Sequence, residues 1–386
     1  MGYYLATLAA ALSGGWIGIK IKMPAGALIG SMLAVAAFNL LTGKAAFPSQ
    51  TAVVLQCLTG AYMGAKIGKR EALDMLKSVK AGVLLSLCMC LFSTLVSFLI
   101  VRFSAMDPAT ALFSTAPGGI ADMSLIALEM GADPAIVAIM QVSRIVAVVM
   151  LMPALIKRIT LKMRKKGLTS NLKKEPVAAQ MSASCSATIE MGETALPLTN
   201  DRLSSQDEEG QGKEVREVPR KNIKAMLLTL AVGLTAGIIG RILKIPAGAI
   251  TFSMIACAAY HIKTDRVYLP KKMSLVVQIF AGLVIGLKMD IEQMTGMSRL
   301  LPVIFPVMAG YIVFNLAAAA LLSRFARMDG VTALYASASG GLGDMTILAD
   351  QAGADSVKVL SVHLMRYISV LMLYPYLTRL LLTLFT

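Results

Sequence analysis

The stretch TALFSTAPGGIADM at 110–123 returns as TALYASASGGLGDM at 332–345, and this pair of motifs decides the fold. The shift of 222 positions between them (332 minus 110) aligns the two ends of the chain without a gap. Each motif places a Gly-Gly pair inside an apolar segment, and an Asp follows the pair. Duplicated apolar halves with matched polar residues are typical of membrane transport folds, so we expect two homologous membrane repeats.

The composition predicts an all-α, polytopic membrane protein. The chain has 386 residues, of which 56% are hydrophobic and 15% are charged, whereas a soluble protein has about 25% charged residues. Apolar stretches such as 81–101 and 223–243 exceed the roughly 18 residues that a membrane-spanning helix needs. The lipid bilayer is therefore the first partner that we expect.

The basic residues predict that the membrane is the cytoplasmic (inner) one. The formal net charge is +15, and the Lys and Arg residues gather between the apolar segments, which is the positive-inside pattern. We therefore expect no nucleic-acid partner. The five cysteines contain no CxxC motif and the chain has two histidines, so the sequence predicts no metal site and no cofactor. The sequence leaves homo-oligomerisation open.

Three regions follow from the hydropathy pattern. Residues 1–159 are a first membrane repeat, residues 160–222 a polar cytoplasmic linker, and residues 223–386 a second membrane repeat. The linker has few large apolar residues and mixed charge, so we expect it to be disordered. Each repeat has six apolar segments, and the Gly-Gly motif breaks the fifth. Unwound backbone at membrane depth survives only where protein or a water-filled cavity surrounds it.

The orientation of the second repeat depends on whether this fifth segment crosses the membrane. If it crosses, each repeat has six spans and the repeats are parallel; if it enters and returns, each has five spans and the second repeat is inverted. The loop after the third segment has five basic residues in the first half and two in the second. After the second segment the bias reverses, from one to four. This reversal favours inversion, with ten spans, two broken or re-entrant segments and both termini outside.

Arg144 and Arg366 are the first candidates for a site. Each lies near the middle of the last apolar segment of its repeat, which at ~1.5 Å per residue is close to the bilayer midplane. An ionised Arg there costs ~2.5–3.5 kcal/mol on insertion scales, so it needs a partner or a cavity. One interpretation is a clamp onto a carboxylate or onto exposed carbonyls of the broken segment. The other is direct contact with an anionic solute, and the two are compatible.

Asp122 and Asp344 follow the Gly-Gly pairs by three residues. One interpretation is a capping or first-turn residue in the helix that resumes after the break. The other is a cation or proton site beside unwound carbonyls. The glycines are candidates too, because backbone N–H groups at a half-helix N-terminus suit an anion; they are Gly118, Gly119, Gly340 and Gly341.

Gln56 and Gln278 each begin a Q-x-x-x-G-x-x-x-G pattern. Its spacing places all three residues on one helix face, which predicts close helix packing through the glycines. The Gln amide is either part of that packing or lines a site. His363 occupies the position of Gln141 in the other repeat and is the sharpest difference between the two copies. It is either a hydrogen-bonded structural residue or a group that takes part in proton coupling.

These motifs, together with K-x-P-A-G-A at 22–27 and 244–249, resemble the AbrB duplication family of multi-pass membrane proteins. This is not the DNA-binding regulator of the same name. The resemblance covers both halves but not the linker. Labels within the family conflict, between ammonia monooxygenase and regulator, so the resemblance implies little about activity. A metal oxygenase needs several imidazole or carboxylate ligands together, and two histidines do not supply them, so we expect no enzyme.

The sequence therefore predicts a secondary transporter with a central site at the two broken helices. The arginines suggest a small anionic solute, although the charge pattern does not identify the solute or a coupling ion. No P-loop pattern is present, which disfavours direct ATP-driven transport. The alternative is a membrane-embedded regulator or sensor that affects gene expression, as some family labels suggest.

Overall fold

The computed structural model describes residues 2–21, 25–48, 50–104, 106–165, 223–265, 267–270, 272–289 and 291–385. At some helical positions, Asp344 among them, the backbone alone is described. The predicted linker lies outside the described residues from 166 onward, so its disorder and the repeat boundaries remain predictions. Every regular element within the described ranges is an α-helix, which confirms the all-α class.

The first repeat contains α1 (Gly2–Lys20), α2 (Gly26–Thr42), α3 (Thr51–Gly64), α4 (Lys69–Lys77), α5 (Val79–Phe103), α6 (Pro108–Thr115), α7 (Ile120–Glu129) and α8 (Pro134–Lys165). The second repeat contains α10 (Ile223–Ile242), α11 (Gly248–Thr264), α12 (Lys272–Gly286), α13 (Ile291–Phe325), α14 (Gly330–Ser337), α15 (Leu342–Gln351) and α16 (Ser356–Phe385). With the shift of 222, α13 corresponds to α4 and α5 joined into one helix. The short amphipathic α4, in which no residue is buried, is an element that the segment pattern did not predict.

Several helices are long and apolar enough to cross a bilayer. Within the described residues they are Val79–Phe103, Pro134–Met152, Ile223–Ile242, Pro302–Phe325 and Ser356–Thr383. Shorter apolar helices, such as α2, α3 and α12, accompany them. A helix of about 20 apolar residues spans the hydrocarbon core, so the chain is a multi-pass membrane protein.

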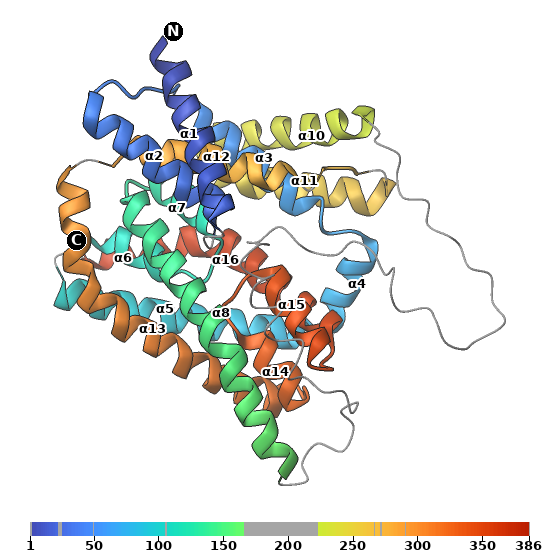
Figure 1. Cartoon of the computed structure of the whole chain (residues 1–386). Helices are drawn as coiled ribbons and strands as arrows, with labels where there is room; N and C mark the ends of the chain where they lie inside the picture. The colour runs from blue at the N-terminus through green and yellow to red at the C-terminus, as the bar shows by residue number, and fades with distance from the viewer. Residues whose placement is uncertain are drawn as a thin grey trace.

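The helices form two bundles, and each bundle takes equivalent helices from both repeats. The first bundle consists of α1, α2, α3, α10, α11 and α12, which lie in the upper part of Figure 1. The second consists of α5 to α8 and α13 to α16. Within the first bundle α2 packs on α12 and α3 on α11, and within the second α5 packs on α16 and α8 on α13. This crosswise pairing is what a two-fold relation between the repeats requires.

Glycines allow the close approach of helices in the first bundle. A Cβ atom added at Gly60 would collide with the backbone carbonyl of Ile250 on α11, and one at Gly282 would collide with that of Leu28 on α2. The two glycines occupy equivalent positions, and each faces the other repeat. Small residues at helix interfaces bring backbones together where no hydrophobic force from water acts. The packing face predicted from the Q-x-x-x-G-x-x-x-G pattern is therefore present in both repeats.

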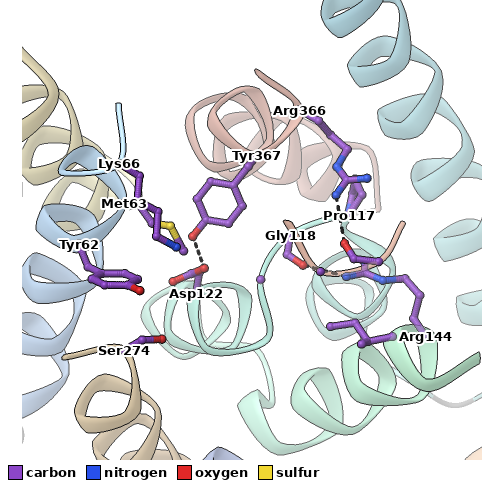
Figure 2. A pocket seen from close by; sticks show the side chains of 14 residues that line it. Tyr62, Met63, Lys66, Pro117, Gly118, Asp122, Arg144, Ser274, Arg366 and Tyr367 are labelled. Atoms are coloured by element: carbon purple, nitrogen blue, oxygen red, sulfur yellow. Dashed lines mark hydrogen bonds between the residues drawn. The ribbon is translucent and has the colours of Figure 1, made fainter. Parts of the chain in front are cut away.

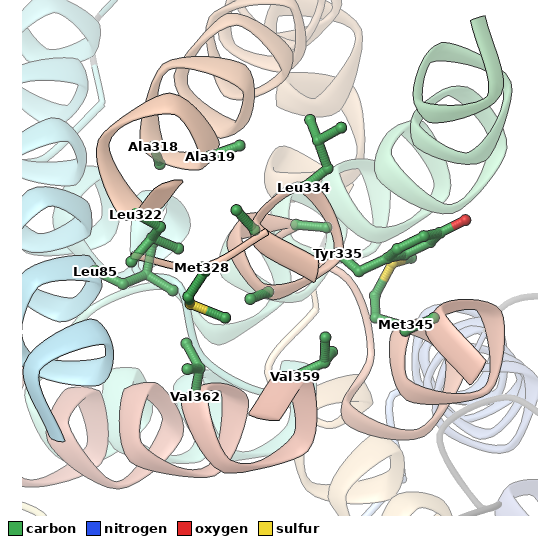
Figure 3. Close-up of a cluster of buried hydrophobic side chains, with 14 of the residues drawn as sticks. Leu85, Ala318, Ala319, Leu322, Met328, Leu334, Tyr335, Met345, Val359 and Val362 are labelled. Carbon is green, nitrogen blue, oxygen red and sulfur yellow. The ribbon is translucent and has the colours of Figure 1, made fainter. Parts of the chain in front are cut away.

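The second bundle has an apolar core that surrounds the hairpin of the second repeat. Figure 3 shows Leu85 of α5, Leu322 of α13 and Val362 of α16 around α14, which carries Leu334, and all four side chains are buried. Met345 of α15 belongs to the same cluster. The two short helices of the hairpin are therefore packed on protein, as unwound backbone within a membrane requires.

The broken fifth segment is a re-entrant hairpin in both repeats. The backbone N–H of Asp133, just before α8, donates to Thr110 Oγ1 at the start of α6 over 2.9 Å. The backbone N–H of Asp355 donates to Thr332 Oγ1 in the same way over 3.0 Å. The chain therefore leaves each hairpin at the level at which it entered. A hairpin of this kind adds no crossing.

The re-entrant hairpins bear on the orientation of the repeats. If the other five apolar segments of each repeat cross the membrane, as the sequence predicts, five crossings remain in each repeat when the fifth segment returns to its own side. An odd number of crossings reverses the direction of whatever follows, so we infer that the second repeat is inverted, as the loop charges predict. In an inverted pair the two hairpins enter the membrane from opposite sides, and their tips approach each other near the midplane.

Candidate functional site

A pocket lies where the two hairpin tips meet, and it combines residues of both bundles. Figure 2 shows the two tips with Arg144 and Arg366 on one side of Gly118 and Asp122 on the other. The tips come from the loops between α6 and α7 and between α14 and α15. The lining residues are Tyr62, Met63, Lys66, Pro117, Gly118, Gly119, Asp122, Arg144, Ile145, Ser274, Gly340, Gly341, Arg366 and Tyr367.

Each arginine donates hydrogen bonds to backbone carbonyl groups of its own hairpin tip. Arg144 donates from Nη1 to the carbonyl of Ala116 over 2.7 Å and from Nη2 to that of Gly118 over 2.8 Å. Arg366 donates to the carbonyl of Ala338 over 3.0 Å and, more weakly, to that of Gly340 over 3.5 Å. These carbonyls belong to backbone that has left the helix and lacks the usual i→i+4 partner. The clamp, one of the two interpretations of these arginines, is present.

The clamp orients the two guanidinium groups. Its four hydrogen bonds do not neutralise their positive charge, because carbonyl oxygens carry no net charge. Both side chains are buried, with 3% of Arg144 and 5% of Arg366 exposed. The two groups are close enough for their positive charges to repel each other. A buried pair of cations at the wall of a pocket favours an anion between them, because the anion relieves the repulsion. The clamp and anion contact are therefore compatible in one geometry.

Asp122 lies in the first turn of α7, three residues after the N-cap residue Gly119. The phenolic O–H of Tyr367 on α16 donates to Asp122 Oδ2. Lys66 is close enough to interact electrostatically with the carboxylate. The helix dipole also favours a negative charge in the first turn. Asp122 therefore joins the hairpin of one repeat to the last helix of the other.

The second hairpin matches the first in its backbone. Gly341 is the N-cap residue of α15, as Gly119 is of α7, and Gly340 and Gly341 line the pocket. The side chain of Asp344 lies outside the described residues, so its predicted role stays a prediction.

The remaining predicted residues do not belong to the lining of the pocket. Gln56 donates from Nε2 to the carbonyl of Leu125 over 3.2 Å and to Glu129 Oε2 over 3.1 Å. Glu129 also accepts from Arg241 Nη1 over 2.8 Å, which ties the base of the first hairpin to α10. Gln278 is 3.5 Å from Ser274 Oγ, and Ser274 lines the pocket. Gln56 thus holds the hairpin in place.

His363 and Gln141 make equivalent bonds. His363 Nε2 is 3.1 Å from the carbonyl of Tyr335. Gln141 donates from Nε2 to the carbonyl of Phe113, the residue equivalent to Tyr335, over 2.9 Å, and to that of Ala116 over 2.8 Å. Both side chains therefore satisfy the carbonyls at the end of the short helix that precedes each break. The geometry favours the structural interpretation of His363.

Four polar residues of the lining were not predicted as site residues: Lys66, which entered the sequence analysis only as a loop charge, and three residues that are polar in one repeat alone. The three are Tyr62, Ser274 and Tyr367, and the equivalent positions in the other repeat hold Val284, Ala52 and Ile145. A comparison of the two copies reveals polar residues that both copies hold, whereas these three are matched by apolar residues. A different signal could have found them: a residue that is polar in one repeat alone and lies within one helical turn of a polar residue shared by both repeats.

The sequence of the two repeats also shows which protein family the chain belongs to. The profile of the family described as "Transition state regulatory protein AbrB" matches residues 2–160 and 193–382. The chain belongs to this AbrB family. The match falls on two separate regions, as the duplication requires, and confirms the resemblance seen in the motifs.

Two relatives of this AbrB-family chain are informative. "Uncharacterized protein YhjN" of Bacillus subtilis (strain 168) is 28% identical over 331 residues, which cover 83% of this chain and 76% of the relative. "Putative regulator AbrB" of Escherichia coli (strain K12) is 24% identical over 376 residues, which cover 97% of this chain and 94% of the relative. The word regulator is said of that relative, and the fold alone does not assign it to this chain.

Proposed function

We propose that this protein is a secondary transporter of a small anion in the cytoplasmic membrane, with its substrate site at the two hairpin tips. The observation that supports it best is the pocket in which two unwound tips and two arginines, one from each repeat, meet. Substrate sites at broken helices between inverted repeats recur in secondary transporters. In this proposal the solute crosses unchanged, so no enzymatic step is involved.

The charges of the pocket support an anion as the solute. Arg144 and Arg366 point their guanidinium groups at the tips, and Lys66 adds a third cation to the lining. The short helices α7 and α15 also begin at the pocket, where their N-cap glycines lie. The positive end of each helix dipole and the backbone N–H groups of the first turn favour a negative ligand there.

The two bundles supply a physical basis for alternating access. Tyr62 of α3 and Ser274 of α12 come from the first bundle, whereas the tips and both arginines come from the second. The pocket therefore lies at the interface of the bundles. We propose that the glycine-packed first bundle is the frame, and that movement of the second bundle against it opens the pocket to each side in turn.

A second candidate function is a membrane-embedded regulator or sensor, which the printed name of the relative from Escherichia coli suggests. In that case the pocket would bind a ligand without moving it across the membrane. Ligand-dependent binding of a partner protein, in the absence of any flux, is the result that would favour this candidate.

The experiment is a flux measurement with purified protein in proteoliposomes. Radiolabelled sulfate, phosphate and succinate serve as probe anions, and entry is measured with and without the protein. We expect protein-dependent entry of at least one probe. Arg366→Gln should lower this entry by roughly tenfold or more, because a charge-assisted contact is worth about 1.5–3 kcal/mol.

Two further variants control for folding. Arg366→Lys keeps the positive charge and should retain part of the flux, although it cannot reproduce the two-pronged clamp. Lys358→Gln changes an exposed cation on the same helix, α16, and should leave the flux unchanged. All proteins are compared by thermal melting in detergent first. Equal flux in a folded Arg366→Gln variant, or no protein-dependent flux of any probe, would contradict the proposal.

A further inference from the structure

The pocket is asymmetric although the repeats that build it are homologous. Around Asp122 stand three hydroxyl groups, those of Tyr62, Tyr367 and Ser274. Their counterparts in the other repeat, Val284, Ile145 and Ala52, are apolar. One side of the pocket thus has three hydroxyl groups that the homologous positions of the other repeat lack.

The charged groups that face Asp122 come from every element packed around it. Lys66 follows α3 and stands over the ring of Tyr62, with its Nζ 4.4 Å from the ring centroid. Arg144 comes from α8 and Arg366 from α16. Among the side chains described in the lining there are thus three cations and one carboxylate. Asp122 and an incoming anion compete for the same positive charge.

We propose that Asp122 is the proton acceptor that couples anion transport to proton movement, so that a proton and an anion cross together. This inference rests on the proposed function and names its coupling ion. A proton added to the carboxylate removes its negative charge, so the carboxylate no longer competes with the anion for the positive charge of the lining. The proton forms the O–H bond of a carboxylic acid on one side of the membrane and is released from it on the other, so the step balances without a further reactant.

Thermodynamic linkage makes the coupling reciprocal. If protonation of Asp122 raises the affinity for the anion, then the bound anion raises the affinity of Asp122 for the proton by the same factor. The same positive surroundings disfavour a metal cation at this carboxylate. The phenolic group of Tyr367 is a positioning residue: it donates to the carboxylate and can accept from the carboxylic acid, so the contact persists in both protonation states.

The test uses proteoliposomes that contain a pH-sensitive dye, and the probe is whichever of sulfate, phosphate or succinate the wild-type protein transports. Addition of the anion outside should acidify the interior. Asp122→Asn should abolish most of this acidification, by roughly tenfold or more, within the usual range for coupling between two sites. Exchange of labelled for unlabelled anion should continue in the same variant, because the arginines remain.

Three more variants make the outcome specific. Asp122→Glu keeps a carboxylate and should restore part of the acidification. Tyr367→Phe should keep the coupling and shift the pH dependence of uptake toward higher pH, because the charged carboxylate loses a donor. Asp74→Asn removes a carboxylate on α4 that pairs with Lys77 and should change nothing.

The possible failures are distinguishable. Anion flux without acidification, or uptake driven by a Na⁺ gradient instead of a proton gradient, overturns the proton coupling and leaves the proposed anion transport standing. Normal acidification by Asp122→Asn also overturns it. The absence of flux for every probe in the wild-type protein overturns both.

Discussion

Arg144 and Arg366 show how single residues stabilise a break in the middle of a membrane. The helix before each Gly-Gly pair ends with carbonyls that lack the i→i+4 backbone donor of a continuing helix. Side chains one turn apart on the last helix of each repeat supply the donors, Arg144 with Gln141 and Arg366 with His363. Unwound backbone in lipid is costly unless it is satisfied in this way. The same residues thus position the tip and shape the pocket.

His363 can be tested against its own counterpart. Because Gln141 makes the equivalent bond, His363→Gln should melt within a few degrees of the wild-type protein. His363→Leu leaves the Tyr335 carbonyl without this donor and should destabilise the protein by about 1–3 kcal/mol, which lowers the melting temperature measured in detergent. An unchanged pH profile of transport in His363→Gln agrees with the structural interpretation. Loss of proton coupling in that variant would show that the histidine titrates during transport.

At the residue scale, a comparison of the two repeats predicts part of the pocket lining, but it does not predict the lining residues that differ between the repeats. Polar residues and glycines matched in both repeats predict Asp122, Arg144, Arg366 and the glycines of both tips, and all of these line the pocket. The same matching predicts Asp344, whose side chain lies outside the described residues. Gln56 and Gln278 were matched too, but their amides bond to neighbouring elements. Tyr367 could not be found by matching, because its role arises from the contact between one hairpin and the other repeat.

At the scale of elements, helix packing followed from the sequence more closely than helix boundaries did. The glycine faces of α3 and α12 were predicted from spacing alone and pack as expected. The separate helix α4 was missed. It stands alone because the chain turns at Ser78, whereas the equivalent position in the second repeat lies inside the continuous α13. A local turn of this kind has no hydropathy signal.

Gly60 offers a test of the packing between α3 and α11. An added Cβ would meet the Ile250 carbonyl and, at 2.9 Å, the Cβ of Ser253. Gly60→Ala should therefore destabilise the protein by about 1–3 kcal/mol through overpacking, despite the gain of up to ~1 kcal/mol in helix propensity. The matched control is Gly310→Ala on α13, whose added Cβ would be 3.5 Å from Phe92. A Gly60→Ala protein that melts no earlier than the control would show that this contact is looser than described.

At the scale of the whole molecule, two crosswise bundles and two opposed hairpins account for the central position of the pocket. The sequence alone left open whether the fifth segment crosses, because hydropathy cannot distinguish a crossing from a return. The loop charges favoured a return, and the bonds from Asp133 to Thr110 and from Asp355 to Thr332 support it. What remained beyond prediction was which bundle each helix joins, since that depends on contacts between residues far apart in the chain.

The central claim, that the two hairpins enter from opposite sides and meet at one site, is tested most directly by labelling equivalent positions at their bases. Met130 ends the first hairpin, and Ala352, which is 222 residues later, ends the second. Each is replaced by Cys in a background without the native cysteines, and a membrane-impermeant maleimide is applied to intact cells and to inside-out vesicles. The account predicts that Met130→Cys is labelled in intact cells and Ala352→Cys in inside-out vesicles. Labelling of both from the same side would contradict it.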